Sequence, residues 1–286
     1  MDWNRYSSLF ARMSAGLMIL LSLGLFQAQA GPPRFKRVVI VVLENTDFSK
    51  AISQPFLTDL ANRGALLTQL AATTHPSQPN YIALIAGSTL GVKSNASADL
   101  GEQHIGDLLE ATGRGWKVYA EDYPGNCFKG GSNKGYVRKH NPFISFTNVQ
   151  NSPQRCARIV NTSEFEKDVQ SGVLPEYSLY VPNLKNDGHD TGVGFADQWL
   201  ASTFSNLLND PRFTTDTLFV VTFDENAGSA GNIVYTSFSG PMVRPGAVSS
   251  RTYTHFGLLR TIEDELGLGT LGRQDQTATA ITDVWR

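Results

Sequence analysis

The chain has 286 residues, of which 41% are hydrophobic and 17% are charged, and its formal net charge is -2. This composition is that of a globular protein, long enough for one large domain with an extensive core. A net charge this close to zero argues against a general nucleic-acid-binding protein, which needs a basic surface to contact phosphates.

Residues 1–30 have the pattern of a secretory signal peptide. Two arginines give the positive flank, residues 15–26 form the apolar stretch, and Ala28-Gln29-Ala30 is a small-x-small cleavage site. We therefore expect cleavage after this motif, a single mature domain over residues 31–286, and a secreted protein, extracellular or periplasmic, without a stable membrane anchor. The alternative is an uncleaved anchor, but the apolar stretch is shorter than the roughly 18–20 residues that a spanning helix needs.

The first predicted element of the mature chain is a strand at residues 37–43, an unbroken apolar run typical of a strand covered on both faces. A helix at residues 55–63 follows and ends at Gly64, a natural C-cap. The later elements are expected, in chain order, as helices at 79–86 and 105–111, strands at 116–120 and 177–181, a helix at 195–208, strands at 217–223 and 233–236, and a helix at 256–266. This alternation predicts an α/β fold, a three-layer α/β/α sandwich with a largely parallel central sheet.

Residues 121–163 lack this alternation and are predicted to form an irregular insertion. They contain the two cysteines of the chain, Cys127 and Cys156. In an oxidising compartment these two are expected to form a disulfide, and two free buried thiols are the alternative. Asn95 and Asn161 begin segments that fit the N-glycosylation pattern.

Two polar pairs follow the two strongest predicted strands. Glu44-Asn45 comes after residues 37–43, and Asp224-Glu225 comes after residues 217–223. Because ligands of such folds gather beyond the carboxyl ends of the strands, we expect the pairs to converge. Carboxylate and amide oxygens suit a hard divalent cation such as Ca²⁺, Mg²⁺ or Mn²⁺, and Zn²⁺ would fit if histidines joined them. Each pair taken alone can also be read as solvated loop residues.

Ser77 is the candidate nucleophile. Pro76 and Pro79 flank it, and proline is favoured in the first helical turn, so Ser77 is predicted near a helix N-terminus. Free backbone N–H groups and the helix dipole favour an anion at such a position. A hydroxyl beside a divalent cation ionises more easily and can attack phosphorus. The alternative reading is a simple N-cap serine.

Three histidines are candidates for the chemistry. His189 lies in a polar loop flanked by glycines, which favours a functional role over core packing. His255 opens the last predicted helix, where a surface residue near the cap is the alternative. His140, beside the added charge of Lys139, is a candidate contact to phosphate, with a solvated basic turn as the alternative. The remaining histidines, His75 and His104, give weaker signals.

With these motifs the chain resembles the secreted phosphoesterase family that includes acid phosphatases and bacterial-type phospholipases C, within the alkaline phosphatase superfamily. The resemblance covers about residues 36–267. It rests on short motifs whose order and spacing together are specific: Val42-Leu43-Glu44-Asn45, Pro76-Ser77-Gln78-Pro79-Asn80-Tyr81, Lys139-His140-Asn141-Pro142-Phe143, Asn186-Asp187-Gly188-His189-Asp190, Phe223-Asp224-Glu225-Asn226 and Tyr253-Thr254-His255.

The resemblance implies an alkaline-phosphatase-like fold and a serine nucleophile, Ser77, that forms a phospho-enzyme. It implies a divalent metal ion held by Glu44, Asn45, Ser77, Asp224 and Glu225. It also implies residues near the transferred phosphoryl group or a second metal, namely His189, Asp190 and His255, and an amide that contacts phosphate, Asn95.

Two departures narrow this expectation. Two-metal relatives commonly have an aspartate after a proline, whereas here Asn183 follows Pro182, so we expect one metal or a loosely occupied site. Sulfatases have an arginine four residues after the nucleophile, where this chain has Tyr81. The predicted function is a secreted, metal-assisted phosphomonoesterase that acts on a small phosphate ester. The rival hypotheses are a phospholipase C-type phosphodiesterase with the same residues and a secreted binding protein that has lost catalysis.

Overall fold

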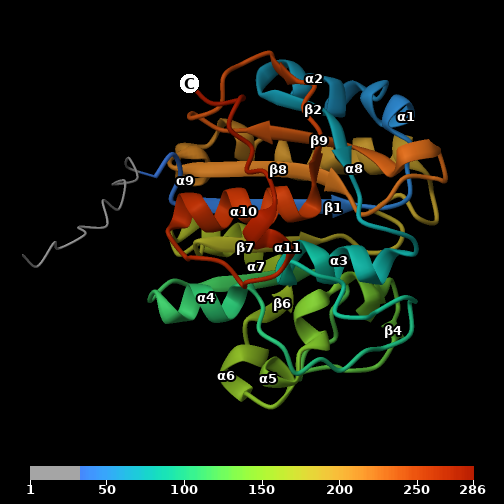
Figure 1. Ribbon diagram of the computed structural model, residues 1–286, viewed down its shortest axis with the longest axis vertical. Helices are drawn as coiled ribbons and strands as arrows, with labels where there is room; N and C mark the ends of the chain where they lie inside the picture. Colours follow the sequence, from blue (N-terminus) through green and yellow to red (C-terminus); the bar gives the residue numbers. More distant parts are fainter. Residues whose placement is uncertain (1–32) are drawn as a thin grey trace, which may run out of the picture. The chain divides into compact units, whose positions relative to one another are not determined.

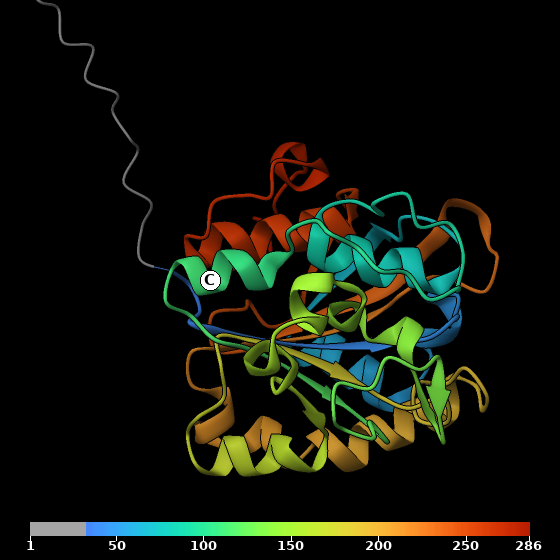
Figure 2. The same ribbon diagram turned by 90° about the horizontal axis from the view of Figure 1, so that it is seen from below.

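The computed structural model describes residues 33–286, so the predicted signal peptide lies outside the described residues. Residues 33–286 form one compact unit around a nine-stranded sheet. Helices cover both faces of this sheet, which gives the three layers seen in Figures 1 and 2. The predicted α/β/α sandwich is thereby confirmed. Among the described residues, no helix combines the length and apolar character needed to cross a membrane.

The sheet is mostly parallel, with one reversed strand. Its order is β10-β2-β9-β8-β1-β7-β3-β6, and β11 also pairs with β2. The strand β9 runs antiparallel to both of its neighbours, and the other pairings are parallel. The strands of this sheet are β1 (Arg37–Leu43), β2 (Ala65–Ala71), β3 (Trp116–Ala120), β6 (Ile159–Asn161), β7 (Tyr177–Val181), β8 (Thr217–Phe223), β9 (Ile233–Ser239), β10 (Ala247–Ser249) and β11 (Tyr253–Thr254).

The helices divide between the two faces of the sheet (Figures 1 and 2). One face carries α3 (Ser77–Ala86), α4 (Ile105–Ala111), α10 (His255–Leu266) and α11 (Gln274–Thr277). The other carries α2 (Pro55–Arg63), α7 (Ser163–Gln170) and α8 (Val193–Phe204). Shorter helices are α1 (Phe48–Ile52), α5 (Thr147–Gln150), α6 (Pro153–Cys156) and α9 (Pro211–Thr214), and 3₁₀ turns are η1 (Arg138–His140), η2 (Pro142–Ser145), η3 (Leu207–Asn209) and η4 (Ala230–Asn232).

The central strands β1 and β8 set the position of the site. All residues of β8 are buried, and so are those of β1 after Arg37, because helices cover both faces. The two strands pair in register from Arg37 opposite Thr217 to Leu43 opposite Phe223. Since they are parallel and end together, the residues that follow them emerge side by side at one edge of the sheet.

The predicted elements agree with the structure except at some ends. The sequence did not predict β2, β6, β10, β11 or α7, and β6 is a strand of the central sheet inside the segment 121–163 that was expected to be irregular. The helix predicted from residue 79 begins at Ser77, and the helix predicted at 195–208 is α8 followed by η3. The sequence of β2, with Thr68 and Gln69 in the middle of an apolar run, gave no strand signal. Its partly exposed residues are tolerated because β2 lies near the edge of the sheet.

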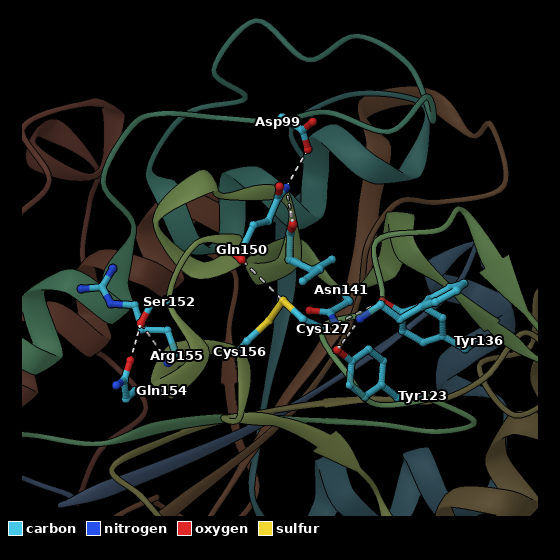
Figure 3. The surroundings of a disulfide bond; sticks show 12 residues. Asp99, Tyr123, Cys127, Tyr136, Asn141, Gln150, Ser152, Gln154, Arg155 and Cys156 are labelled. Carbon is cyan, nitrogen blue, oxygen red and sulfur yellow. Dashed lines mark hydrogen bonds between the residues drawn. A yellow bond between two sulfur atoms is a disulfide. The ribbon is translucent and has the colours of Figure 1, made fainter.

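The insertion at residues 121–163 is irregular but tied together. It contains the hairpin of β4 (Ser132–Asn133) and β5 (Tyr136–Val137) and the short helices α5 and α6. A disulfide joins Cys127 to Cys156, as expected, with the two Cα atoms 5.4 Å apart (Figure 3). Gln150, which lies between the two cysteines in the sequence, donates hydrogen bonds through its side chain to Asp99 at 2.6 Å and to the Ile144 carbonyl at 2.9 Å. A cross-link over a loop of this size contributes about 3 kcal/mol by restricting the unfolded chain.

Candidate active site

The two acidic strand ends lie together at the carboxyl edge of the sheet. Glu44 follows β1 and Asp224 follows β8, and the Asp224 backbone N–H donates to the Leu43 carbonyl at 3.0 Å. The side chains of Glu44, Asp224 and Glu225 are all buried. In Figure 1 this edge is where the arrows of β1 and β8 end. The register of two buried strands, rather than loop structure, brings these carboxylates together.

Asn45 turns the chain away from the sheet. Its φ is 42°, in the left-handed region that asparagine tolerates better than most residues. In this conformation its backbone N–H faces Asp224 Oδ1 at 3.4 Å, and the same oxygen accepts the Glu225 backbone N–H at 2.7 Å. The backbone at both strand ends therefore fixes the orientation of the Asp224 carboxylate.

Ser77 lies against these carboxylates. Its Oγ is 3.1 Å from Glu44 Oε2 and 3.3 Å from Glu225 Oε1, and Lys139 Nζ is 3.5 Å away. Ser77 is buried at the first position of α3, and Pro76 occupies the N-cap. The alternative of an N-cap serine does not describe this geometry, because the Ser77 hydroxyl points to the acids. The Gln78 backbone N–H is instead bonded to Asn95 Oδ1 at 3.0 Å, so Asn95 lies next to Ser77 at the helix start.

The carboxylates strongly perturb one another. Burial acts to raise the pKa of Glu44, but the charges of His140 and Lys139 outweigh this effect and lower that pKa to about 2. Burial raises the pKa of Asp224 well above its ordinary value, and the neighbouring Glu44 and Glu225 carboxylates raise it further. Burial also raises the pKa of Glu225, with His75 opposing and Glu44 adding to the shift. The opposite shifts of Glu44 and Asp224 show that the cations of the site act mainly on Glu44.

His140 lies behind Glu44, where it is fully buried. Its Nε2 is 2.9 Å from Glu44 Oε1, its Nδ1 is 3.2 Å from Asp187 Oδ2, and its ring stacks on Tyr81. Both contacts are close but lack the angles of hydrogen bonds, so they are ion pairs. Burial acts to lower the pKa of His140, and the carboxylates on its two sides outweigh this effect and raise it. This placement suits a residue that orients Glu44 better than one that touches phosphate.

His189 is connected to the same group through Asp187. Its backbone N–H donates to Asp187 Oδ1 at 2.8 Å, and its Nδ1 is 2.7 Å from Asp190 Oδ1. The imidazole is partly exposed, with 35% of its side-chain surface accessible. His189 and Asp190 thus form a surface pair, which is connected to Glu44 by three contacts through Asp187 and His140.

His255 contacts the backbone at the end of β8. It is fully buried, and its Nε2 is 3.1 Å from the carbonyl oxygen of Phe223, the residue before Asp224. Burial lowers the pKa of His255 to about 4, so the ring is neutral near pH 7 and donates through Nε2. Within the described residues, its hydrogen bond is to the backbone and not to Ser77.

Two side chains for which the sequence gave only weak signals also lie at the site. His75 Nδ1 is 2.5 Å from Glu225 Oε2, and Lys139 Nζ approaches Ser77 as described above. The available signal for His75 was its position two residues before Ser77, and for Lys139 its position next to His140. By contrast, His104 caps α4, where its Nδ1 accepts the Gly106 backbone N–H at 3.0 Å, so its role is structural.

The donor set fits a hard cation, although the acids are not arranged as a closed cluster. In residues 33–286, no group of three or more His, Cys, Asp and Glu side chains is spaced to hold a metal ion. However, Asp224 Oδ2 is buried without a hydrogen-bond partner, beside two other carboxylates. Unpaired buried carboxylate oxygens are the ligands that Ca²⁺, Mg²⁺ and Mn²⁺ take. The oxygens of Asn45 and Ser77 would complete such a set.

Asn183, the residue that suggested a single metal, forms hydrogen bonds with other groups of the protein. Its Oδ1 accepts the backbone N–H groups of Lys185 and Asn186, and its Nδ2 donates to Asp122 at 2.8 Å. The amide oxygen thus already accepts two hydrogen bonds, and it carries no negative charge with which to attract a metal ion. The expectation of one metal rather than two stays a prediction.

A cavity of about 430 Å³ opens beside the acids. Its lining is polar and small: Asn45, His75, Glu225, Asn226, Ala227 and Gly228. A cavity of this volume is within the range that accommodates a small molecule. Apart from the imidazole of His75, no aromatic or long aliphatic side chain is among its lining residues.

Comparison with known proteins indicates the family to which this chain belongs. The sequence model of the Phosphoesterase family matches residues 50–269. The chain belongs to the Phosphoesterase family. Ser77, Asp224 and Glu225 lie inside the matched segment of the family, and Glu44 precedes it. The predicted family is confirmed.

Two relatives carry the comparison further. A protein of Kluyveromyces lactis described as a probable acid phosphatase is 38% identical over 260 residues, which cover 86% of this chain and 62% of that protein. The phosphatidylinositol-3-phosphatase of Mycobacterium tuberculosis is 38% identical over 263 residues, which cover 90% of this chain and 85% of that protein. The chain therefore spans less than two thirds of the yeast relative but most of the mycobacterial one.

Solved structures agree on the fold. A protein in the alkaline phosphatase superfamily from Vibrio parahaemolyticus superimposes with a TM-score of 0.60 at 15% identity, covering 85% of this chain and 71% of that chain. At this identity the likeness shows the fold alone. The predicted alkaline-phosphatase-like architecture is confirmed.

Proposed function

We propose that this protein is a metal-assisted phosphomonoesterase of the acid phosphatase type that uses Ser77 as its nucleophile. The observation that carries the proposal is the position of Ser77 Oγ, 3.1 Å from Glu44 and 3.3 Å from Glu225, at the start of α3. A serine at a helix N-terminus beside buried acids combines a nucleophile, an anion-binding end and oxygen ligands. Membership of the Phosphoesterase family supports this reading.

In the proposed reaction, Ser77 Oγ forms a bond to phosphorus in line with the leaving oxygen. The bond from phosphorus to that oxygen breaks, and its electron pair leaves with the alcohol. The Ser77 proton departs along one of its two hydrogen bonds, to Glu44 or to Glu225. Water then attacks phosphorus, the bond to Oγ breaks, and a proton from the attacking water passes to Oγ, so inorganic phosphate is released and the Ser77 hydroxyl is restored. Such transfer needs mainly positioning and charge stabilisation.

The other residues of the site support these steps. A divalent cation held by Glu44, Asn45, Ser77, Asp224 and Glu225 would supply Lewis-acid charge stabilisation. His140 orients Glu44, and His255 orients the backbone before Asp224. Asn95, which lies beside Gln78 at the helix start, offers an amide to the phosphate. His189, paired with Asp190 and partly exposed, is the proposed proton donor to the leaving alcohol.

A small phosphomonoester is the proposed substrate. The cavity beside Glu225 has polar and small lining residues, which suits a polar leaving group better than the acyl chains of a phospholipid diester. The two relatives described above are both named as phosphatases. Secretion, extracellular or periplasmic, remains part of the proposal on the basis of the signal-peptide pattern at residues 1–30.

An activity screen of the purified protein tests the proposal. We expect hydrolysis of 4-nitrophenyl phosphate, much slower hydrolysis of bis(4-nitrophenyl) phosphate, and loss of both on treatment with a chelator. Re-addition of Mg²⁺, Ca²⁺, Mn²⁺ or Zn²⁺ one at a time should restore activity with at least one of them. Faster turnover of the diester would favour the phospholipase C-type alternative, and no turnover of any phosphate ester would favour a binding protein.

A further inference from the structure

Lys139 is the cation nearest to the candidate nucleophile. Its Nζ lies 3.5 Å from Ser77 Oγ. Within residues 33–286, Lys139 forms no ion pair with a carboxylate within 4.0 Å. The ammonium group lies beside the serine, and its charge also acts on Glu44, whose pKa it helps to lower. A half-buried lysine in this position has its charge available for an anion that enters the site.

The neighbours of Lys139 on both sides are locked. Arg138 is buried and donates to the carbonyl oxygens of Lys129 at 2.9 Å and Ala98 at 2.6 Å, and to Asp99 at 2.7 Å. His140 is buried between Glu44 and Asp187. The 3₁₀ turn η1 that contains all three residues is closed by the Asn141 N–H donating to the Arg138 carbonyl. The backbone of Lys139 is thus fixed, which reduces the cost of aiming its side chain at Ser77.

The charges of the site explain why a lysine is needed. Glu44, Asp224 and Glu225 are three carboxylates that face the same serine or each other. A divalent cation would offset two of these negative charges, and His140 and His75 lie against Glu44 and Glu225. The ammonium of Lys139 adds a positive charge directly beside Ser77, where a phosphoryl group would bind. Because Coulomb attraction scales with the charge of the substrate, this lysine attracts a dianion about twice as strongly as a monoanion.

We propose that Lys139 is a catalytic residue that binds the phosphoryl oxygens beside Ser77 and selects dianionic phosphomonoesters over monoanionic phosphodiesters. This inference rests on the proposed function. Lys139 keeps its proton throughout and forms no covalent bond. It donates hydrogen bonds to a non-bridging oxygen of the substrate, and it stabilises the negative charge that Ser77 Oγ carries when its proton has left and before the bond to phosphorus forms.

Four variants test this proposal. Lys139→Gln and Lys139→Met remove the charge, Lys139→Arg keeps it, and Lys134→Gln removes an exposed lysine of the same insertion outside the site. We expect Lys139→Gln to lower kcat/KM for 4-nitrophenyl phosphate about 100-fold, as for loss of a donor to a developing oxyanion. For bis(4-nitrophenyl) phosphate the expected loss is about tenfold, because the substrate carries half the charge. Lys139→Arg should recover part of the activity, and Lys134→Gln should resemble the parent protein.

A binding measurement separates this proposal from the proposed function. Titration calorimetry of the purified protein, without chelator, with inorganic phosphate should show affinity about tenfold weaker in Lys139→Gln than in Lys134→Gln. Thermal unfolding of each variant establishes that it is folded. Equal phosphate affinity together with an unchanged monoester-to-diester ratio would overturn the assignment of Lys139. Weakened phosphate binding in a protein that hydrolyses no ester would support Lys139 as a phosphate ligand and remove the phosphoesterase proposal instead.

Discussion

Glu44 and Asp224 follow two paired, fully buried strands, whereas Lys139 and His140 belong to a 3₁₀ turn in the insertion at residues 121–163. The first region places acids by the register of a sheet. The second places cations by buried hydrogen bonds and ion pairs, and a disulfide ties its ends. The two regions meet at Ser77, which contacts Glu44 on one side and Lys139 on the other.

This difference has a physical consequence for each region. The ends of β1 and β8 are rigid because the paired backbone of the two strands is buried. The carboxylates that follow these strands repel one another and cannot move apart. The cations of the insertion relieve part of that repulsion. His140 is the link, since it contacts Glu44 of the sheet edge and Asp187 at once. We infer that the acidic edge of the sheet binds the cation. The insertion reduces the repulsion among the carboxylates and receives the substrate.

The largest effect is expected when the acidic edge is broken. Asp224→Asn keeps the shape of the side chain but removes the charge of a ligand, so it should weaken metal binding and lower kcat by at least about 100-fold. Metal content measured by plasma emission spectrometry checks the first part. Asp216→Asn, at the opposite end of the same strand, is the matched control and should leave both quantities unchanged. Unaltered metal content in Asp224→Asn would rule out this site.

A smaller loss is expected when the link between the regions is removed. His140→Gln takes away the partner that orients Glu44, and loss of such a supporting contact typically costs about 10–100-fold in metal affinity or activity. His104→Gln replaces another buried histidine, one that caps α4 away from the site. We expect His104→Gln to lower the melting temperature with little effect on kcat. Equal kinetic losses in the two variants would mean that His140 acts only through stability.

The smallest effect is a pH dependence of stability in the chelator-treated protein. Glu44 has a lowered pKa, so its contribution is present above its ordinary value of 4.5 and is lost as pH falls through about 2. His140 has a raised pKa, so its contribution is present below its ordinary value of 6.5 and is lost as pH rises through the folded value. The melting temperature of the parent protein should therefore exceed that of His140→Gln most between about pH 4.5 and 6.5. A difference that does not change with pH would contradict the ion pair.

The acidic half of the site could be predicted from the sequence because it depends on local pattern. Residues 37–43 and 217–223 are apolar runs with β-branched side chains, and the polar residues after them must emerge at the edge of the sheet. The prolines on either side of Ser77 similarly indicated the start of a helix. The disulfide followed from two cysteines and an expected oxidising compartment.

The cationic half could not be predicted in the same way. The contact of Lys139 with Ser77 joins residues 62 positions apart through an irregular turn that has no periodic pattern. The burial of His140 between two acids, and the ion pair of His75 with Glu225, depend equally on long-range packing. The strand β2 was missed for a related reason, because its place near the sheet edge relaxes the apolar pattern.

The role of Ser77 as nucleophile can be tested by mass spectrometry of the peptide containing Ser77 after rapid acid quenching of the enzyme during turnover of 4-nitrophenyl phosphate. We expect one added phosphoryl group on Ser77 in the parent protein, and none, together with no turnover, in Ser77→Ala. Phosphate found on another residue, or hydrolysis by Ser77→Ala at more than a few per cent of the parent rate, would contradict this role.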